Sequence, residues 1–309
     1  MITVESLRKQ YGDLVAVDDL SFQAEAGGIF GLLGPNGAGK STTIGCISGL
    51  LRPTSGRVSV MGHDVVSDGR ESRRQLGIVP QELAVYEDLN ARENLSYWGG
   101  AYGLSGAELK GRVDEVLELV GLSDRAKEAV KGFSGGMKRR LNFAAGVVHR
   151  PKVLLLDEPT VGVDPQSRVR LLELVRAQAA AGMCVLYTTH YMEEAESLCD
   201  RLAIVDHGKI IATGTLPELR ALLGERDLLR LTGTFDPIAV REALDRVAGV
   251  EVVLADAEGL TLAAPGASAR LPELFGVVQG VGGEIRETTL TLPNLETLFI
   301  KLTGKELRE

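Results

Sequence analysis

The chain has 309 residues, 44% hydrophobic and 25% charged, which is typical of a globular protein with room for two cores. Its net charge of −8 argues against a general nucleic-acid binder, because non-specific affinity for phosphate backbones depends on basic surface. The sequence shows no membrane-spanning apolar run, no secretory signal, no C-x-x-C pair and no histidine spacing typical of zinc. We therefore expect a cytosolic protein with reduced thiols.

A glycine-rich loop follows the first clear strand. Residues 28–33 are an apolar run typical of a buried strand, and residues 43–50 can form a helix. Between them, the pattern G-x-x-x-x-G-K-[ST] is matched at every required position, which favours a phosphate site over a plain glycine turn. Backbone N–H groups and the helix dipole would attract an anion there, Lys40 would contact the β- and γ-phosphates, and the Ser41 hydroxyl would bind Mg²⁺. The predicted nucleoside triphosphate site consists of Gly34, Pro35, Asn36, Gly37, Ala38, Gly39, Lys40, Ser41 and Thr42.

Residues 1 to about 222 alternate short apolar runs with amphipathic segments, the pattern of an α/β domain. Apolar residues between about 90 and 130 recur near helical spacing, and Asp164-Pro165 opens a helix that Gly182 closes. Further buried strands are predicted at 153–156, 184–188 and 202–205.

The strand at 153–156 is followed directly by two carboxylates. Phosphate-loop enzymes place an aspartate at this position to hold Mg²⁺, which here would be Asp157. Glu158 would then be placed to accept a proton from an attacking water. The alternative is a core strand that ends in surface acids.

A Ser-Gly-Gly segment precedes another predicted helix. Ser134 can cap that helix, and Gly135 and Gly136 would let a phosphate approach its N–H groups. With a phosphate loop upstream and Asp-Glu-Pro-Thr downstream, the segment resembles the signature of ABC-type ATPases, although Phe133 and Met137 replace the commonest Leu and Gln. The basic run at 138–140 suggests phosphate binding, but we interpret it as a solvated helix face beside the nucleotide.

The resemblance implies roles for further residues. Gln81 would sense Mg²⁺ and water and couple the site to a membrane partner, His190 would contact the γ-phosphate, and Tyr11 would stack on adenine. Asp164 would lie at the loop that crosses a dimer interface, although helix capping explains this residue nearly as well. The implied ligands are ATP and Mg²⁺, with Ser41, Gln81 and Asp157 as the residues that hold the metal.

The resemblance also implies an assembly. In relatives, the phosphate loop of one subunit and the signature of another enclose each ATP, so we expect a head-to-tail homodimer that ATP closes and hydrolysis reopens. Segments 133–141, 188–200 and 204–219 resemble the ATPase subunits of drug and antibiotic exporters of the daunorubicin-resistance-like group. Such a subunit powers a separate permease from the cytoplasmic face of the cell membrane, with no nucleic acid expected. The alternative is a soluble ABC ATPase that acts on ribosomes or nucleic acid, although such relatives usually carry two nucleotide domains or a long insertion.

We expect two domains, a nucleotide-binding domain at 1–222 with a helical subdomain at about 87–150, and an accessory or regulatory domain at 223–309. The second carries no nucleotide motif, and its pattern predicts a small ferredoxin-like α+β domain. Its expected elements are strand 228–232, helix 237–247, strands 251–254 and 260–264, helix 270–278, strand 285–291 and helix 295–302.

Overall fold

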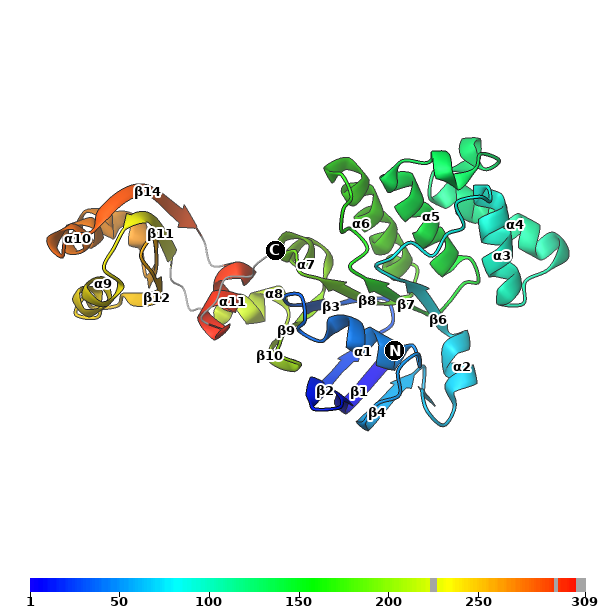
Figure 1. The fold of residues 1–309 in the computed structure, drawn as a ribbon, viewed down its shortest axis with the longest axis horizontal. Coiled ribbons are helices and arrows are strands. Elements are labelled where there is room, and N and C mark those ends of the chain that lie inside the picture. The colour runs from blue at the N-terminus through cyan, green and yellow to red at the C-terminus, as the bar shows by residue number, and fades with distance from the viewer. Residues whose placement is uncertain (223–226, 292–293, 304–309) are drawn as a thin grey trace. The chain divides into compact units, whose positions relative to one another are not determined.

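The computed structural model describes residues 1–222, 227–291 and 294–303 (Figure 1). The chain divides into two compact units, Met1–Ile211 and Ala212–Glu309, which are described in turn.

A six-stranded sheet forms the centre of the first unit. Its order is β10-β9-β3-β8-β7-β6, and the neighbours from β9 to β6 run parallel. Helices on both sides explain why its strands read as continuous apolar runs. The four strands predicted here are present to within one residue at each end. The strands are β3 (Ile29–Leu33), β6 (Leu76–Val79), β7 (Val153–Asp157), β8 (Cys184–Thr189), β9 (Arg201–Asp206) and β10 (Lys209–Gly214).

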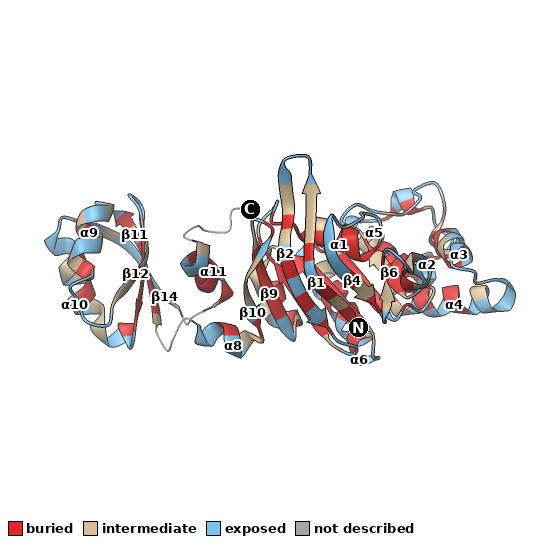
Figure 2. Ribbon diagram, turned by 90° about the horizontal axis from the view of Figure 1, so that it is seen from below, coloured by how far each residue is buried: buried red, intermediate tan, exposed pale blue. Residues whose placement is uncertain are grey.

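A second, antiparallel sheet has the order β2-β1-β4-β5. Its inner face shares one core with α1 (Lys40–Ile47) and the parallel sheet, and Figure 2 shows the buried positions running along these strands. The strands are β1 (Ile2–Tyr11), β2 (Leu14–Ala24), β4 (Ser55–Val60) and β5 (His63–Asp64).

The remaining helices of this unit include a cluster of three, α3, α4 and α5, around the buried residues Leu95, Val113 and Leu117. Helix α5 also packs against β6 and α6, so the cluster is attached to the sheet that carries the phosphate loop. The helices are α2 (Gly69–Arg74), α3 (Ala91–Ala101), α4 (Gly106–Leu119), α5 (Gly135–Val147), α6 (Pro165–Ala180) and α7 (Met192–Leu198).

The second unit contains a four-stranded antiparallel sheet of order β12-β13-β11-β14. Helices α9 and α10 bury one face around Leu231, Leu244 and Leu274, and α11 packs on α8 and β12. All seven elements expected beyond residue 222 occur in the predicted order, and α8 precedes them in this unit. The elements are α8 (Leu216–Ala221), β11 (Asp227–Thr234), α9 (Pro237–Leu244), β12 (Glu251–Ala255), β13 (Gly259–Ala264), α10 (Ala267–Gly280), β14 (Glu284–Thr291) and α11 (Leu295–Thr303).

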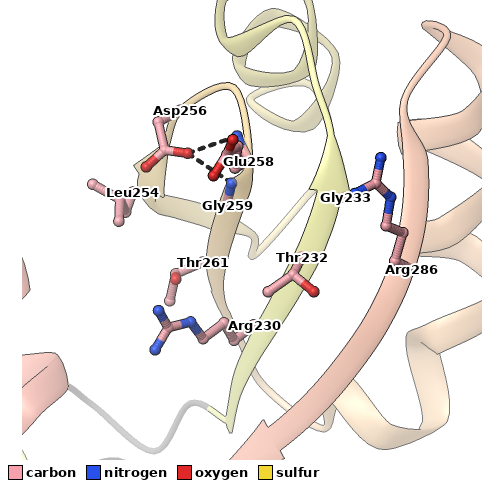
Figure 3. Close-up of a pocket in the computed structure, with 9 residues that line it drawn as sticks. All are labelled: Arg230, Thr232, Gly233, Leu254, Asp256, Glu258, Gly259, Thr261 and Arg286. Carbon is pink, nitrogen blue, oxygen red and sulfur yellow. Dashed lines mark hydrogen bonds between the residues drawn. The ribbon is translucent and has the colours of Figure 1, made fainter.

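A polar hollow of about 430 Å³ lies on the sheet of the second unit (Figure 3). Arg230 and Arg286 line it, as does the turn between β12 and β13, where Asp256 Oδ1 accepts hydrogen bonds from the amides of Glu258 (2.9 Å) and Gly259 (2.6 Å). Over the described ranges, no His, Cys, Asp and Glu side chains cluster as metal ligands would, and no helix is long and apolar enough to cross a membrane.

Candidate nucleotide site

The phosphate loop joins β3 to α1 and is held closely by its surroundings. The Lys40 side chain is 4% exposed, and its Nζ donates to the carbonyl oxygens of Gly34 (2.7 Å) and Pro35 (3.0 Å). Gly39 has a φ of 101°, and a Cβ there would lie 2.6 Å from the Ala16 carbonyl oxygen. Only glycine meets both conditions, so the helix can begin directly at Lys40, three residues before the apolar run that predicted it.

Three side chains from separate predicted motifs meet beside this loop. Glu158 Oε1 lies 2.9 Å from Lys40 Nζ, and Glu158 Oε2 lies 2.9 Å from His190 Nδ1. Lys40 enters from α1, Glu158 follows β7 and His190 follows β8, and these two strands are parallel neighbours. The geometry therefore places an ammonium, a carboxylate and an imidazole together at the carboxyl edge of the sheet, where α/β proteins bind ligands.

The backbone of Glu158 is fixed in an uncommon conformation. Its φ is 43°, a left-handed geometry that costs a non-glycine residue about 1–2 kcal/mol. Its amide donates to the carbonyl oxygen (3.2 Å) and to Oγ1 (3.1 Å) of Thr188, whose hydroxyl donates to Asp157 Oδ1 at 2.7 Å. Thr188, to which the sequence assigned no role, thus orients the Asp157 carboxylate and fixes the backbone of Glu158. Such backbone strain is typical of functional sites.

The signature segment lies at the start of α5. Ser134 Oγ accepts from the Met137 amide at 3.3 Å, which confirms the predicted cap. A Cβ on Gly136 would lie 2.0 Å from Ser167 Oγ, whereas a Cβ on Gly135 would meet nothing within 4 Å. Gly136 is therefore needed for packing inside the chain, while Gly135 is open to a ligand.

Asp164 caps α6, as its sequence predicts, because its Oδ1 accepts from the Ser167 amide at 2.9 Å. Hydrogen bonds from the amide and from the side chain of Ser167 lower the pKa of the Asp164 carboxyl. Through Ser167, Asp164 lies next to Gly136 of the same chain. Among the described contacts of Lys40, Glu158 and His190, no hydrogen bond or ion pair reaches residues 134–136.

Gln81 is exposed in the loop after β6, and its carbonyl accepts from Arg139 Nη1. Arg139 Nη2 donates to the Val161 carbonyl at 3.0 Å, and burial lowers the pKa of the Arg139 guanidinium. A side chain of the signature helix thus joins the Gln81 loop to the loop that follows Glu158.

The run at 138–140 is not the solvated face that its charge suggested. All three side chains are half-buried: Lys138 Nζ pairs with Glu87 Oε1 at 2.5 Å, and Arg140 Nη1 donates to the Val120 carbonyl at 2.5 Å. Their cations bind a carboxylate and several loop carbonyls, and these contacts draw the side chains against the chain.

The two outer residues of the predicted site are accessible. Tyr11, at the end of β1, is 43% exposed, and Lys9 Nζ lies 4.8 Å from the centre of its ring. Ser41 is exposed in the first turn of α1.

Comparison with known proteins agrees with this geometry. The family model described as ABC transporter matches residues 17–161, within the first unit. The linearmycin resistance ATP-binding protein LnrL of Bacillus subtilis (strain 168) is 44% identical and covers 100% of both chains. The daunorubicin resistance ATP-binding protein DrrA3 of Streptomyces coeruleorubidus is 40% identical over 99% of this chain and 97% of its own.

A dimeric structure of a bacterial ABC transporter cassette superposes with a TM-score of 0.64 and 25% identity, covering 70% of this chain and 98% of that one. Its match reproduces the fold, and the full-length relatives extend the likeness through the second unit. The chain therefore belongs to the ABC transporter family, as an ATP-binding subunit that hydrolyses ATP.

Proposed function

We propose that this ATPase powers a separate membrane permease that exports a drug, an antibiotic or another hydrophobic small molecule, and that it works at the cytoplasmic face of the cell membrane. The main observation that supports the ATPase mechanism is the placement of Glu158 between Lys40 and His190. The class of cargo is inferred from the two relatives, which are named for resistance to linearmycin and daunorubicin. An ATP-binding transport subunit confers resistance most directly by removing the compound from the cell.

The ion pair between Lys40 and Glu158 suggests how ATP prepares its own hydrolysis. The buried ammonium can bind either the carboxylate or a γ-phosphate, since both are anions that compete for the same donors. A phosphate on Lys40 releases Glu158 toward the attacking water, where it accepts the proton, while His190 donates to the phosphate.

Mg²⁺ fits the oxygen donors gathered here. Ser41 offers an exposed hydroxyl, Asp157 offers a carboxylate that Thr188 orients, and Gln81 lies in the exposed loop after the neighbouring strand. Hard oxygen ligands of this kind suit Mg²⁺, which neutralises phosphate charge when it is bound.

We further propose a head-to-tail homodimer in which residues 134–136 of one subunit contact the ATP held by Lys40 of the other. The proposal is supported by the open approach to Gly135, by the helix N-terminus that follows Ser134, and by the dimeric relative. Tyr11 would stack on adenine, and Asp164 would lie at the interface beside the signature.

Complementation between two inactive variants tests the shared site. Lys40→Ala disables the phosphate loop, and Gly135→Asp places a negative charge where phosphate would dock. The added side chain has free space, and an acid suits a helix N-terminus, so the fold should be kept. Each variant alone is expected to be inactive. A mixture forms heterodimers with one intact site, so its ATPase rate should clearly exceed the sum of the two.

A mixture no more active than that sum, although mixed dimers form, would argue for sites complete within one chain. Gly132→Asp is the matched control, because a Cβ there also meets nothing within 4 Å but lies outside the signature. It should leave the rate unchanged.

An exposed aromatic cluster is the surface we propose for the permease. Tyr86 and Tyr97 are 45% and 52% exposed, with ring centres 5.0 Å apart, and both contact the ring of Trp98. Trp98 Nε1 donates to the Ala84 carbonyl at 3.1 Å, which ties the cluster to the loop that carries Gln81. A permease segment bound there would act on the loop that carries Gln81 through this hydrogen bond.

Changing both Tyr86 and Tyr97 to alanine is expected to reduce recovery of the subunit with its permease by at least about tenfold, since buried aromatic anchors dominate interface affinity. Co-purification with the permease partner measures this loss. The ATPase rate of the isolated subunit should be unchanged. Tyr102→Ala is the control, because Tyr102 is similarly exposed but stacks on His149 outside the cluster. Equal losses in both variants would contradict the assignment.

A further inference from the structure

One buried carboxylate close to the site is not accounted for by nucleotide binding. Glu194 on α7 is 2% exposed, and its Oε2 accepts from Tyr187 Oη at 2.8 Å and from Thr189 Oγ1 at 2.9 Å. Burying a carboxylate is costly unless it is paired and hydrogen-bonded. The hydrogen-bond partners of Glu194 therefore indicate its role in the structure.

The hydrogen bonds of Glu194 lead to the residues on either side of His190 in the chain. Thr189 Oγ1, which donates to Glu194, also accepts from the Tyr191 amide at 2.9 Å. Thr189 and Tyr191 are the two chain neighbours of His190, so one carboxylate fixes the backbone on both sides of the imidazole. His190 Nδ1 then lies 2.9 Å from Glu158 Oε2.

Tyr187 strengthens the arrangement as a permanent donor. Burial, together with the charge of Glu194, raises the pKa of Tyr187 well above its ordinary value, so the phenol stays protonated. Its hydroxyl also lies 3.5 Å from Thr160 Oγ1, two residues after Glu158. The network therefore reaches both carboxyl-end loops of the site.

A second connection comes from α6. Arg168 Nε lies 3.5 Å from Glu194 Oε1, and its guanidinium lies 4.7 Å from the ring centre of Tyr191. The Tyr191 ring is in turn 4.2 Å from the His190 ring. Since α6 begins at the cap formed by Asp164, the helix after the proposed interface loop is linked to the histidine segment.

We propose that Glu194 is a positioning residue for His190: through the Thr189 hydroxyl and the Tyr191 amide, it holds the imidazole in the direction that meets Glu158. The inference rests on the proposed role of His190 in hydrolysis. Glu194 itself touches neither the phosphate loop nor ATP.

The NMR signal of the His190 side chain tests this proposal directly. The chain has four histidines, so selective ¹⁵N-histidine labelling gives a simple spectrum, in which the His190→Ala variant identifies the His190 signal. Glu194→Ala is expected to shift the His190 signal and leave those of His63, His149 and His207 in place. It should lower kcat by at least about tenfold with the KM for ATP little changed, the pattern of a lost transition-state contact.

Thr189 supplies a matched pair of variants should Glu194→Ala not fold. Thr189→Val removes only the hydroxyl and should reproduce both effects, whereas Thr189→Ser keeps the hydroxyl and should restore the signal and most of kcat. Glu194→Gln, which keeps an acceptor for both hydroxyls, should also retain most of kcat.

An unchanged His190 signal in Thr189→Val would overturn the proposal, as would a shift shared by all four histidines, which indicates a general structural role. A shifted His190 signal with normal kcat would instead support the positioning contact and refute the catalytic role of His190. The two failures are thus distinguishable.

Discussion

Replacing Lys40 with alanine is expected to abolish ATP hydrolysis and to remove the stabilisation that ATP gives the protein. The ammonium is buried and fixed by two loop carbonyls, so no other cation of the loop can take its place at the phosphates. At an ATP concentration of about 100 Kd, the unmodified chain should gain about 2.7 kcal/mol from binding, and the variant should gain almost none.

Thermal unfolding with and without ATP measures this difference within each variant. The comparison has to be internal, because the variant also leaves Glu158 buried without its lysine, and breaking a buried pair costs about 3–5 kcal/mol. Lys110→Ala, at an exposed position of α4, is the control and should keep the full gain. An undiminished gain or a normal turnover in Lys40→Ala would refute the placement of the triphosphate.

The sequence predicts those parts of the site that consist of short motifs, in which the functional residues are close neighbours in the chain. The loop before Lys40, the carboxylates after β7 and the histidine after β8 each follow a buried parallel strand. Because parallel strands end at the same edge of a sheet, the contact of Glu158 with both Lys40 and His190 follows from the topology.

The supporting residues could not be found in this way. Thr188 and Arg139 act on partners 30 and 58 residues away, and no local pattern marks such contacts. Glu194 acts on Thr189, only 5 residues away, but an acidic residue in the first turn of a helix reads as an exposed side chain, so its burial is not evident from the sequence. Charge alone also predicts solvent exposure for the basic run at 138–140, whereas the structure turns these side chains toward the Glu87 carboxylate and toward loop carbonyls.

The antiparallel sheet of the first unit was also not predicted strand by strand. The pairing of β1 with β2 shifts register between Val4 and Leu7 and again before Lys9, and Ser6 and Asp19 have positive φ values. Such bulges interrupt the two-residue alternation on which strand prediction depends. The second unit has fewer interruptions, and its elements were predicted in order.

Replacing Glu158 with glutamine is expected to stop turnover while favouring the ATP-bound dimer. Loss of a general base lowers a rate by about 10²–10⁴-fold, and glutamine keeps the size and one acceptor atom. The charge that competes with phosphate for Lys40 disappears at the same time, so ATP should bind at least as well as before. ATP that binds and is not hydrolysed should hold two subunits together.

Size-exclusion chromatography with saturating ATP measures the dimer, and single-turnover kinetics measures the chemical step. Glu193→Gln, an exposed change of the same type on α7, should behave like the unmodified chain. The double variant Lys40→Ala/Glu158→Gln should elute as a monomer, because the dimer depends on phosphate held by Lys40. A Glu158→Gln protein that stays monomeric under saturating ATP would contradict the shared site, and one that still hydrolyses ATP at the normal rate would exclude Glu158 as the base.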